Sequence, residues 1–389
     1  MQQPSSQPIP YGRQNITDED IEAVINVLKS DYLTQGPNIA EFEKAFAQYI
    51  GCKYAVALAN GTAALHLCAM ALDVKEGDNV ITTPITFAAS GNCIRYCGGN
   101  VYFADIDPET YTLDINKVEE LIKSKPAGFF KGIIPVDFAG YGVNLEAFRK
   151  LADAHGLWII EDACHAPGGY FTDSKGNKQL CGNGKFAEMS IFSFHPVKHI
   201  ATGEGGMITT NNEELYKKLL LLRTHGITKD PSLMIENHGG WYYEMQELGY
   251  NYRLTDFQAA LGISQLSRAD EGLARRKEIA GRYNEAFKGV EGIVHQSGVV
   301  DGHAYHLYII QVNDRLGLYN HLRANNIFAQ VHYIPVHTHP YYRGLGWKKG
   351  DFPLSEEYYS KCLSLPMYPT LTNEQQDFVI NCVKEYAGN

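Results

Sequence analysis

One lysine occupies an unusual position between an apolar, strand-like run and a glycine-rich turn. Residues 193–206 read Ser-Phe-His-Pro-Val-Lys-His-Ile-Ala-Thr-Gly-Glu-Gly-Gly, so histidine and not an acid follows Lys198. No sequence neighbour offers an ion pair, and burial at such a place would lower the amine pKa from about 10.4. A neutral lysine amine attacks carbonyl groups. Lys198 is therefore a candidate nucleophile, although a single lysine is ordinarily a surface residue.

A carboxylate ends a second apolar run, at residues 159–162 (Ile-Ile-Glu-Asp). Asp162 would be costly to bury there unless a cation paired with it. The protonated pyridine nitrogen of a cofactor is such a cation, and a helix N-cap is the alternative. His165 lies three residues further on. It is interpreted as a residue that orients Asp162, contacts a cofactor ring or packs in the core.

A third segment, residues 60–65 (Asn-Gly-Thr-Ala-Ala-Leu), follows a strand pattern and opens a helix pattern. Free N–H groups and the positive end of the helix dipole suit a phosphate at such a place. Gly61 permits close approach and the hydroxyl of Thr62 adds a donor. Taken alone, this segment is more often a simple helix cap.

Strand and helix patterns that would position these residues alternate along the first two hundred residues. Strands are expected at residues 54–58, 80–83, 101–104, 132–136, 157–161, 189–194 and 206–209. Helices are expected after Thr17, at 37–50, at 61–72, after Phe87, at 115–122 and at 145–155. This alternation predicts a mainly parallel sheet covered on both faces, with ligands at the carboxyl ends of the strands.

The pattern changes in the last third of the chain. A long helix is expected at residues 256–287, strands at 305–312 and 328–332, and helices at 315–325 and 373–386. We therefore predict an α/β protein with two domains. Residues 1–255 would form the large domain that holds the ligand, and residues 256–389 a smaller C-terminal α/β domain.

Composition narrows the classes of function. The 389 residues have a net charge of −10 without a basic block, which argues against nucleic-acid binding. The polar, Pro-rich start has no signal pattern and no long apolar run follows it, so no membrane partner and a cytoplasmic location are expected. The eight cysteines are scattered without a CxxC pair, which favours free thiols.

These segments, together with Gly-Tyr-Asn-Tyr-Arg at residues 249–253, resemble the DegT/DnrJ/EryC1/StrS sugar aminotransferase family. The resemblance runs from about Ile9 to the C-terminus. It implies the aspartate-aminotransferase-like fold (fold type I of pyridoxal-phosphate enzymes). It also implies pyridoxal 5'-phosphate as cofactor, with pyridoxamine 5'-phosphate as the intermediate form.

The resemblance also implies roles for individual residues. Lys198 would form the Schiff base and move protons, and Asp162 would pair with the pyridine nitrogen. Phe87 would stack on the ring, and His165 would lie near the ring hydroxyl. The phosphate would be held by three groups of this chain: Thr62, the N–H of Ala63 and Ser193. Asn251 would reach the phosphate in the neighbouring subunit, which implies a homodimer with shared active sites.

Within the family, residues 32–36, 83–87 and 329–335 are most similar to the transaminases of pseudaminic acid biosynthesis. That similarity implies transfer of an amino group from L-glutamate to C4 of a UDP-linked 4-keto-6-deoxy-N-acetylhexosamine, with the β-L-arabino sugar as the substrate. The D-xylo epimer or a dTDP-sugar is the alternative. The implied substrate-binding residues are Tyr32, Leu33, Thr34, Gln330, Val331, His332 and Tyr333. Arg253 is a candidate for the glutamate carboxylates.

Three other functions are alternatives to this assignment. Related dehydratases have His at the position of Lys198 and form no covalent link to the cofactor. A metal site could use five C-terminal histidines, which are His303, His306, His332, His337 and His339. Pro335 and Pro340 exclude a helix around the last three and favour a loop over the active site. No metal is expected. A non-catalytic scaffold would be expected to lose Lys198, Asp162 or the phosphate segment.

Overall fold

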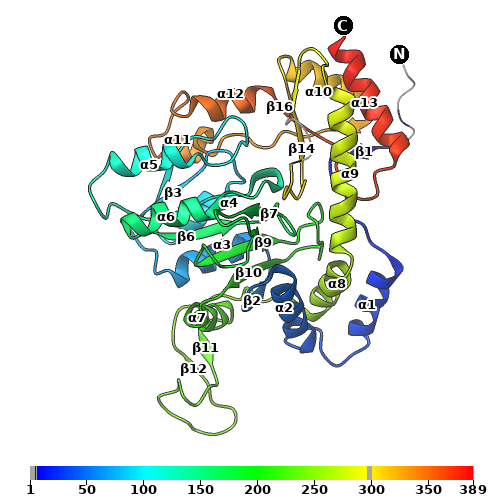
Figure 1. Cartoon of the computed structure of the whole chain (residues 1–389). Coiled ribbons are helices and arrows are strands. Elements are labelled where there is room, and N and C mark those ends of the chain that lie inside the picture. Colours follow the sequence, from blue (N-terminus) through cyan, green and yellow to red (C-terminus); the bar gives the residue numbers. More distant parts are fainter. Residues whose placement is uncertain (1–4, 6, 296–299, 389) are drawn as a thin grey trace.

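A seven-stranded sheet forms the centre of the computed structural model, which describes residues 5, 7–295 and 300–388 (Figure 1). Its order is β2-β10-β9-β6-β5-β3-β4. The strands are Tyr54–Leu58 (β2), Asn79–Thr82 (β3), Asn100–Phe103 (β4), Phe130–Ile134 (β5), Trp158–Asp162 (β6), Met189–Ser193 (β9) and Gly206–Thr210 (β10). Only β10 runs antiparallel to its neighbours, so the prediction of a mainly parallel sheet is confirmed.

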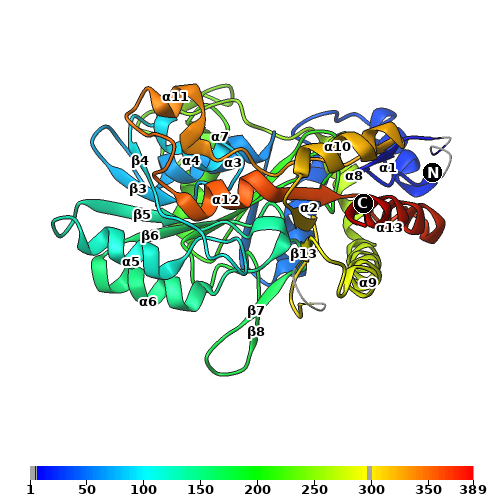
Figure 2. The same ribbon diagram turned by 90° about the horizontal axis from the view of Figure 1, so that it is seen from above.

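Helices cover both faces of this sheet. Figure 2 shows α3 (Gly61–Ala71), α4 (Ala89–Tyr96) and α7 (Glu213–Arg223) on one side, and α5 (Ile115–Lys123) and α6 (Leu145–His155) on the other. The alternation of strand side chains explains the two layers. In β2, Val56 packs in the core beneath α3, while Ala57 packs in the opposite core with α2 (Pro37–Ile50).

The helix predicted at residues 256–287 is wrong in one respect, because it is two helices. α8 (Asp256–Leu266) and α9 (Ala269–Phe287) are separated at Arg268. The guanidinium of Arg268 donates to Asp20, a fully buried residue of α1 (Asp18–Leu28), with one bond of 2.9 Å. The break between the two helices places Arg268 against α1. The apolar periodicity of the sequence continues across this residue, so the sequence alone does not indicate the break.

A second core lies along α9. It contains a three-stranded antiparallel sheet of β13 (Ile293–His295), β14 (Tyr308–Val312) and β16 (Cys362–Leu365), packed with α10 (Arg315–Ala324) and α13 (Asn373–Ala387). Ile9 from the start of the chain joins this core, because β1 (Ile9–Pro10) pairs in parallel with β15 (Ile327–Phe328). The domain boundary at residue 256 stays a prediction.

Two predicted strands of this half are longer than the observed ones. The strand expected at 305–312 begins at Tyr308, after Tyr305 takes a positive φ of 49°. The strand expected at 328–332 is reduced to β15, and Gln330 makes only an isolated bridge to Ser364. The chain beyond β15 is a loop that leads to α11 (Pro340–Arg343) and α12 (Pro353–Lys361).

Two hairpin-like pairs were not predicted. β7 (Tyr170–Thr172) pairs with β8 (Lys178–Leu180), and β11 (Ile227–Thr228) with β12 (Glu244–Met245). The β11–β12 arm, defined as residues 227–250, projects away from the body below α7 (Figure 1).

All eight cysteines are free thiols. Within the described ranges, no helix has the length and apolar character needed to cross a bilayer. Residues 1–4 and 6 of the polar start lie outside the described residues.

Candidate active site

One edge of the central sheet gathers the carboxyl ends of most of its strands. Since β10 is antiparallel to both β2 and β9, those two strands run in the same direction as β6, β5 and β3. A cavity of ≈ 660 Å³ opens at this edge. The predicted site residues that line it are Thr62, Ala63, Phe87, Asp162, His165, Ser193, Lys198, His332 and Tyr333.

Asp162 is a buried carboxylate that two donors hold in place. The hydroxyl of Ser90 donates to its Oδ2 at 2.7 Å, and the backbone N–H of Cys164 donates to its Oδ1 at 3.2 Å. Among the described residues, no lysine or arginine forms a salt bridge with it. A buried carboxyl group with no such partner, lining a cavity, suits a cationic ring nitrogen of a ligand.

Lys198 is partly buried and lines the same cavity. Burial lowers the pKa of its amine, while Cys164 and Asp162 act in the opposite direction. Its Nζ lies 3.5 Å from Nε2 of His306. The neutral form of the amine is therefore more accessible than in an exposed lysine, as a carbonyl nucleophile requires.

The N-terminus of α3 forms one wall of the cavity. Gly206 of β10 permits the close approach of this turn, because a Cβ there would lie 2.5 Å from the carbonyl carbon of Asn60. Asn60 caps the helix through a 2.8 Å bond from the N–H of Ala63 to its Oδ1. The N–H predicted to hold phosphate is thus already engaged, and the first-turn N–H groups of Gly61 and Thr62 suit an anion better.

His165 does not orient Asp162, one of the roles considered for it. Its Nδ1 accepts the N–H of Ala139 at 3.2 Å, and its Nε2 lies 3.2 Å from the hydroxyl of Tyr333. Nε2 therefore carries the proton and donates to Tyr333. Burial, with Lys198 as the next cause, holds the pKa of His165 well below its usual value, in agreement with a neutral ring.

The loop after β15 closes one side of the cavity, as predicted from its prolines. Nδ1 of His332 lies 2.9 Å from the hydroxyl of Ser364, and burial lowers the pKa of this histidine to about 3. His337 lies instead 3.0 Å from Glu356. Within the described ranges, the one group of metal-type ligands with atoms in mutual reach is Asp137, Glu161 and Cys181, which includes none of these histidines.

Six predicted site residues lie outside the cavity walls of the single chain: Asn251, Tyr32, Leu33, Thr34, Gln330 and Val331. Asn251 is exposed and makes an isolated bridge to Thr224. Tyr32 and Leu33 are 56% and 50% exposed. Such exposure of apolar side chains is compatible with a subunit contact, the arrangement that the dimer prediction requires.

Several residues in or beside the cavity were not assigned to the site from the sequence. Tyr11, next to β1, lines the cavity, whereas Ser90 on α4 lies beside it and donates to Asp162, and both reach the site only through tertiary packing. His306 lies 108 residues from its neighbour Lys198. The sequence places His306 inside the strand predicted at residues 305–312 and offers it only as one of the C-terminal histidines that could bind a metal, so it does not point to Lys198.

Comparison with known proteins adds an independent line of evidence. The model of the DegT/DnrJ/EryC1/StrS aminotransferase family matches residues 14–384. A Bacillus subtilis spore coat polysaccharide biosynthesis protein, SpsC, is 40% identical over 386 residues, covering 97% of this chain and 96% of the relative. A Campylobacter jejuni UDP-4-amino-4,6-dideoxy-N-acetyl-beta-L-altrosamine transaminase is 38% identical over 384 residues, covering 95% of each.

Solved structures agree with this picture. PseC of Helicobacter pylori, an aminotransferase of pseudaminic acid biosynthesis, superposes with a TM-score of 0.88 at 30% identity, covering 98% of this chain and 100% of that one. A Streptococcus pneumoniae protein described as a sugar aminotransferase, solved in its PMP and PLP forms, superposes with TM-scores of 0.88 and 0.87 at 29% identity. Each form covers 98% of this chain and 99% of its own length.

Proposed function

Because the chain belongs to the DegT/DnrJ/EryC1/StrS aminotransferase family, we propose that it aminates C4 of a UDP-linked 4-keto-6-deoxy-N-acetylhexosamine with L-glutamate as the donor. The protein is a pyridoxal-phosphate-dependent sugar aminotransferase with the aspartate-aminotransferase-like fold. The proposed substrate is the β-L-arabino 4-keto sugar of pseudaminic acid biosynthesis. The observation that carries the proposal is the convergence of Lys198, Asp162 and the N-terminus of α3 on one cavity.

The residues of the cavity fit the cofactor. When bound, pyridoxal phosphate supplies a carbonyl carbon and a protonated ring that withdraws electrons. Asp162 is assigned to the ring nitrogen, since its carboxylate is held by Ser90 and by the Cys164 N–H while no lysine or arginine of the described part of the chain forms a salt bridge with it. The first turn of α3 and Ser193, at the end of β9, are assigned to the phosphate.

Lys198 is assigned two actions. As a neutral amine it would bind the cofactor carbonyl, and after release it would carry a proton between the cofactor and C4 of the sugar. Both actions require an amine that is easily deprotonated, and burial lowers its pKa in that direction. Tyr333, whose hydroxyl accepts from His165, and Phe87 lie with ring centroids 6.2 Å apart and would limit access of water from that side.

The proposed shared site rests on the single-chain geometry. Asn251, at the base of the β11–β12 arm, is exposed and is absent from the walls of the cavity of its own chain. The arm carries large apolar side chains that are more than half exposed: Leu233, Ile235, Trp241, Tyr243, Met245 and Leu248. A homodimer that covers this arm and brings Asn251 to the partner's cavity would account for both features.

Absorbance spectroscopy of the half-reaction tests the substrate. Protein loaded with pyridoxamine phosphate is mixed separately with the β-L-arabino UDP-4-keto sugar and with its D-xylo epimer, and Lys198→Ala protein serves as the control. The proposal predicts that the pyridoxal absorbance returns much faster with the β-L-arabino sugar, because the two epimers differ in configuration at C5 and a site shaped for one position of the C5 methyl group holds the 4-keto carbon of the other epimer out of line. Reaction with the D-xylo sugar alone would keep the aminotransferase chemistry but assign the enzyme to a different biosynthetic pathway. No reaction with either would contradict the proposal.

A further inference from the structure

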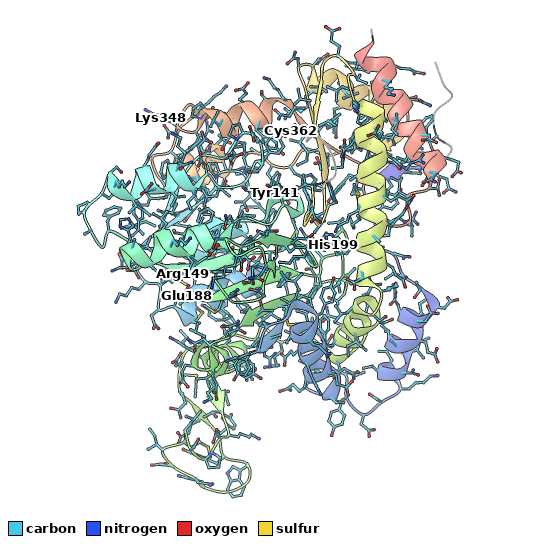
Figure 3. The ribbon with its side chains drawn as sticks, viewed as in Figure 1. Tyr141, Arg149, Glu188, His199, Lys348 and Cys362 are labelled. Carbon is cyan, nitrogen blue, oxygen red and sulfur yellow. The ribbon has the colours of Figure 1, made fainter. Side chains whose placement is uncertain are left out.

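Three neighbouring histidine rings lie near Lys198, with His306 between the other two, and they come from different segments of the chain. His306 precedes β14, His165 follows β6, and His199 is the residue after the lysine. The rings of His165 and His306 lie 4.2 Å apart and those of His199 and His306 lie 5.8 Å apart. His199 lies between the central sheet and α9 (Figure 3).

The outer two rings have assigned partners that fix their tautomers. His165 accepts from the Ala139 N–H and donates to Tyr333. Nε2 of His199 lies 2.8 Å from the carbonyl oxygen of Ala304 and therefore donates to it. The middle ring, His306, has Nε2 directed at Lys198 at 3.5 Å, and its buried Nδ1 has no hydrogen-bond partner among the described residues.

His306 is held in place independently of the lysine. Its ring packs at an interplanar angle of 36° on the ring of His165, whose two nitrogens are both fixed. Its backbone carbonyl accepts from the buried guanidinium of Arg276 at 3.3 Å, and the following residue, Leu307, donates to the carbonyl of Ala139 at 3.1 Å. The position of Nε2 of His306 is therefore fixed by contacts that do not involve the Lys198 amine.

We propose that His306 is the positioning residue of Lys198, which accepts a hydrogen bond from the amine and holds it at the cavity whenever it is not bound to the cofactor. This inference rests on the proposed function and deepens it. An ammonium group has donors only, so Nε2 must be the unprotonated nitrogen when the lysine is charged. A neutral lysine can keep the same bond, because its amine still carries two N–H groups.

Burial, together with the nearby charges, makes His306 an acceptor and not a base. Burial, with Lys198 as the next cause, holds the pKa of His306 well below its usual value, so it does not take the proton itself. A hydrogen bond to the charged amine favours the ammonium form and partly offsets its burial. The titratable and charged groups that face Lys198 are Asp162, Cys164, His165, His199, Arg276, His306 and His332.

Acetylation of the cofactor-free protein tests the proposal without relying on catalysis. The rate of Lys198 modification by acetic anhydride is followed against pH by mass spectrometry, with the exposed Lys348 as the internal reference. In His306→Leu the midpoint for Lys198 should fall by about one pH unit, a tenfold change in the fraction of neutral amine, because the acceptor for the ammonium is lost. His306→Gln, whose amide oxygen reaches a similar point, should restore the midpoint.

His303→Leu is the matched control, because this buried histidine stacks on Tyr305 and accepts from the Tyr305 N–H but does not contact the lysine. It should leave the midpoint unchanged. An unchanged midpoint in His306→Leu, or the same midpoint in the Gln and Leu variants, would overturn the proposal. Should His306→Leu fail to fold, His306→Asn withdraws the acceptor from reach while staying polar, and it must show the lowered midpoint.

Capture of pyridoxal phosphate by the same proteins, followed by stopped-flow absorbance, separates the two claims. At a pH above both acetylation midpoints, where the amine is neutral in either protein, His306→Leu should react at least about tenfold more slowly than wild type, since a mobile amine loses the benefit of orientation. Equal capture rates in wild type and His306→Leu would contradict the positioning role. A wild-type protein that does not react through Lys198 at all would contradict the proposed function, while the acetylation midpoints would still decide the role of His306.

Discussion

Ser90 Oγ donates a 2.7 Å hydrogen bond to Oδ2 of Asp162, and it connects α4 to the end of β6 across 72 residues of sequence. The same hydroxyl lies 2.8 Å from Oγ1 of Thr86. Ser90 is fully buried, so water cannot replace this bond. The carboxylate assigned to the cofactor is therefore oriented from a helix that does not itself carry a cofactor group.

Ser90→Ala should weaken pyridoxal-phosphate binding. Loss of a buried hydrogen bond to a charged group costs about 1.5–3 kcal/mol, which corresponds to a roughly 10- to 100-fold higher Kd. Cofactor titration followed by absorbance measures it. Thr86→Val is the control, because Thr86 contacts Ser90 but not Asp162, and its effect should be smaller. A Kd in Ser90→Ala equal to that of wild type would show that Ser90 does not orient Asp162 for the cofactor.

Asp137 and Glu161 form a buried carboxyl pair behind Asp162. Oδ2 of Asp137 and Oε1 of Glu161 are buried without a donor from any other described residue. Gly182 and Ser190 donate to the other oxygen of Glu161. A proton shared between the two carboxyls satisfies both free oxygens. Burial, followed by the charge of Glu161, raises the pKa of Asp137 well above its usual value.

This pair predicts a loss of stability as the pH rises. The folded-state pKa of Asp137 lies above the unfolded value of about 3.9, so its stabilisation is complete below that pH and is lost towards the folded-state pKa. Asp137→Asn donates to Glu161 without titrating. The Tm of Asp137→Asn should therefore rise relative to wild type as the pH increases above the unfolded value. Asp137→Ala should be less stable throughout, and a Tm gap that does not change with pH would refute the shared proton.

The contribution of Asp20 to the stability of the fold should depend on pH in the opposite direction. Burial raises its pKa, but hydrogen bonds from Arg268, Ser264, Thr17 and Gln265 outweigh that effect and the net shift is downward. Its contribution is present above the unfolded pKa and is lost as the pH falls through the folded value. Arg268→Leu leaves the buried carboxylate unpaired and should cost roughly 3–5 kcal/mol at neutral pH. Urea unfolding measures this cost, which should shrink in acid; a cost that is constant with pH would exclude the ion pair as its source.

The helices with clear end signals were predicted most accurately. Pro37 occupies the first turn of α2 and Gly51 ends it at φ 80°, while Asn144 caps α6 and Gly156 ends it at φ 65°. These signals are local, and both predicted ranges match the structure. The pairing of Ile9 with Ile327 and the break at Arg268 depend on partners hundreds of residues away. No local pattern contains that information.

The candidate site shows the same difference between residues that local sequence signals identify and residues that depend on distant partners. Lys198 and Asp162 were found because each follows an apolar strand whose carboxyl end must meet the others at one sheet edge. Ser90 and His306 act on those two residues through side-chain contacts that only the folded chain creates. The engagement of the Ala63 N–H by Asn60 is equally a matter of helix-cap geometry that the sequence leaves open.

Shared active sites would allow two inactive variants to complement each other. Lys198→Ala and Asn251→Ala homodimers should each be impaired. Random re-pairing of equal amounts would yield intact sites at about one quarter of all positions, each combining Lys198 of one subunit with Asn251 of the other. Activity of the mixture measures this directly. If activity stays at the mean of the two separate variants while mass spectrometry shows mixed dimers, Asn251 acts within its own chain or not at all.

Borohydride reduction of the pyridoxal-phosphate-loaded protein, followed by peptide mass spectrometry, tests the assignment of Lys198 most directly. The account predicts one phosphopyridoxyl group per chain, on the peptide that contains Lys198, and none in Lys198→Arg, which keeps the positive charge. Label on a different lysine in the wild-type protein, or a wild-type protein that binds the cofactor without any reducible link, would contradict it.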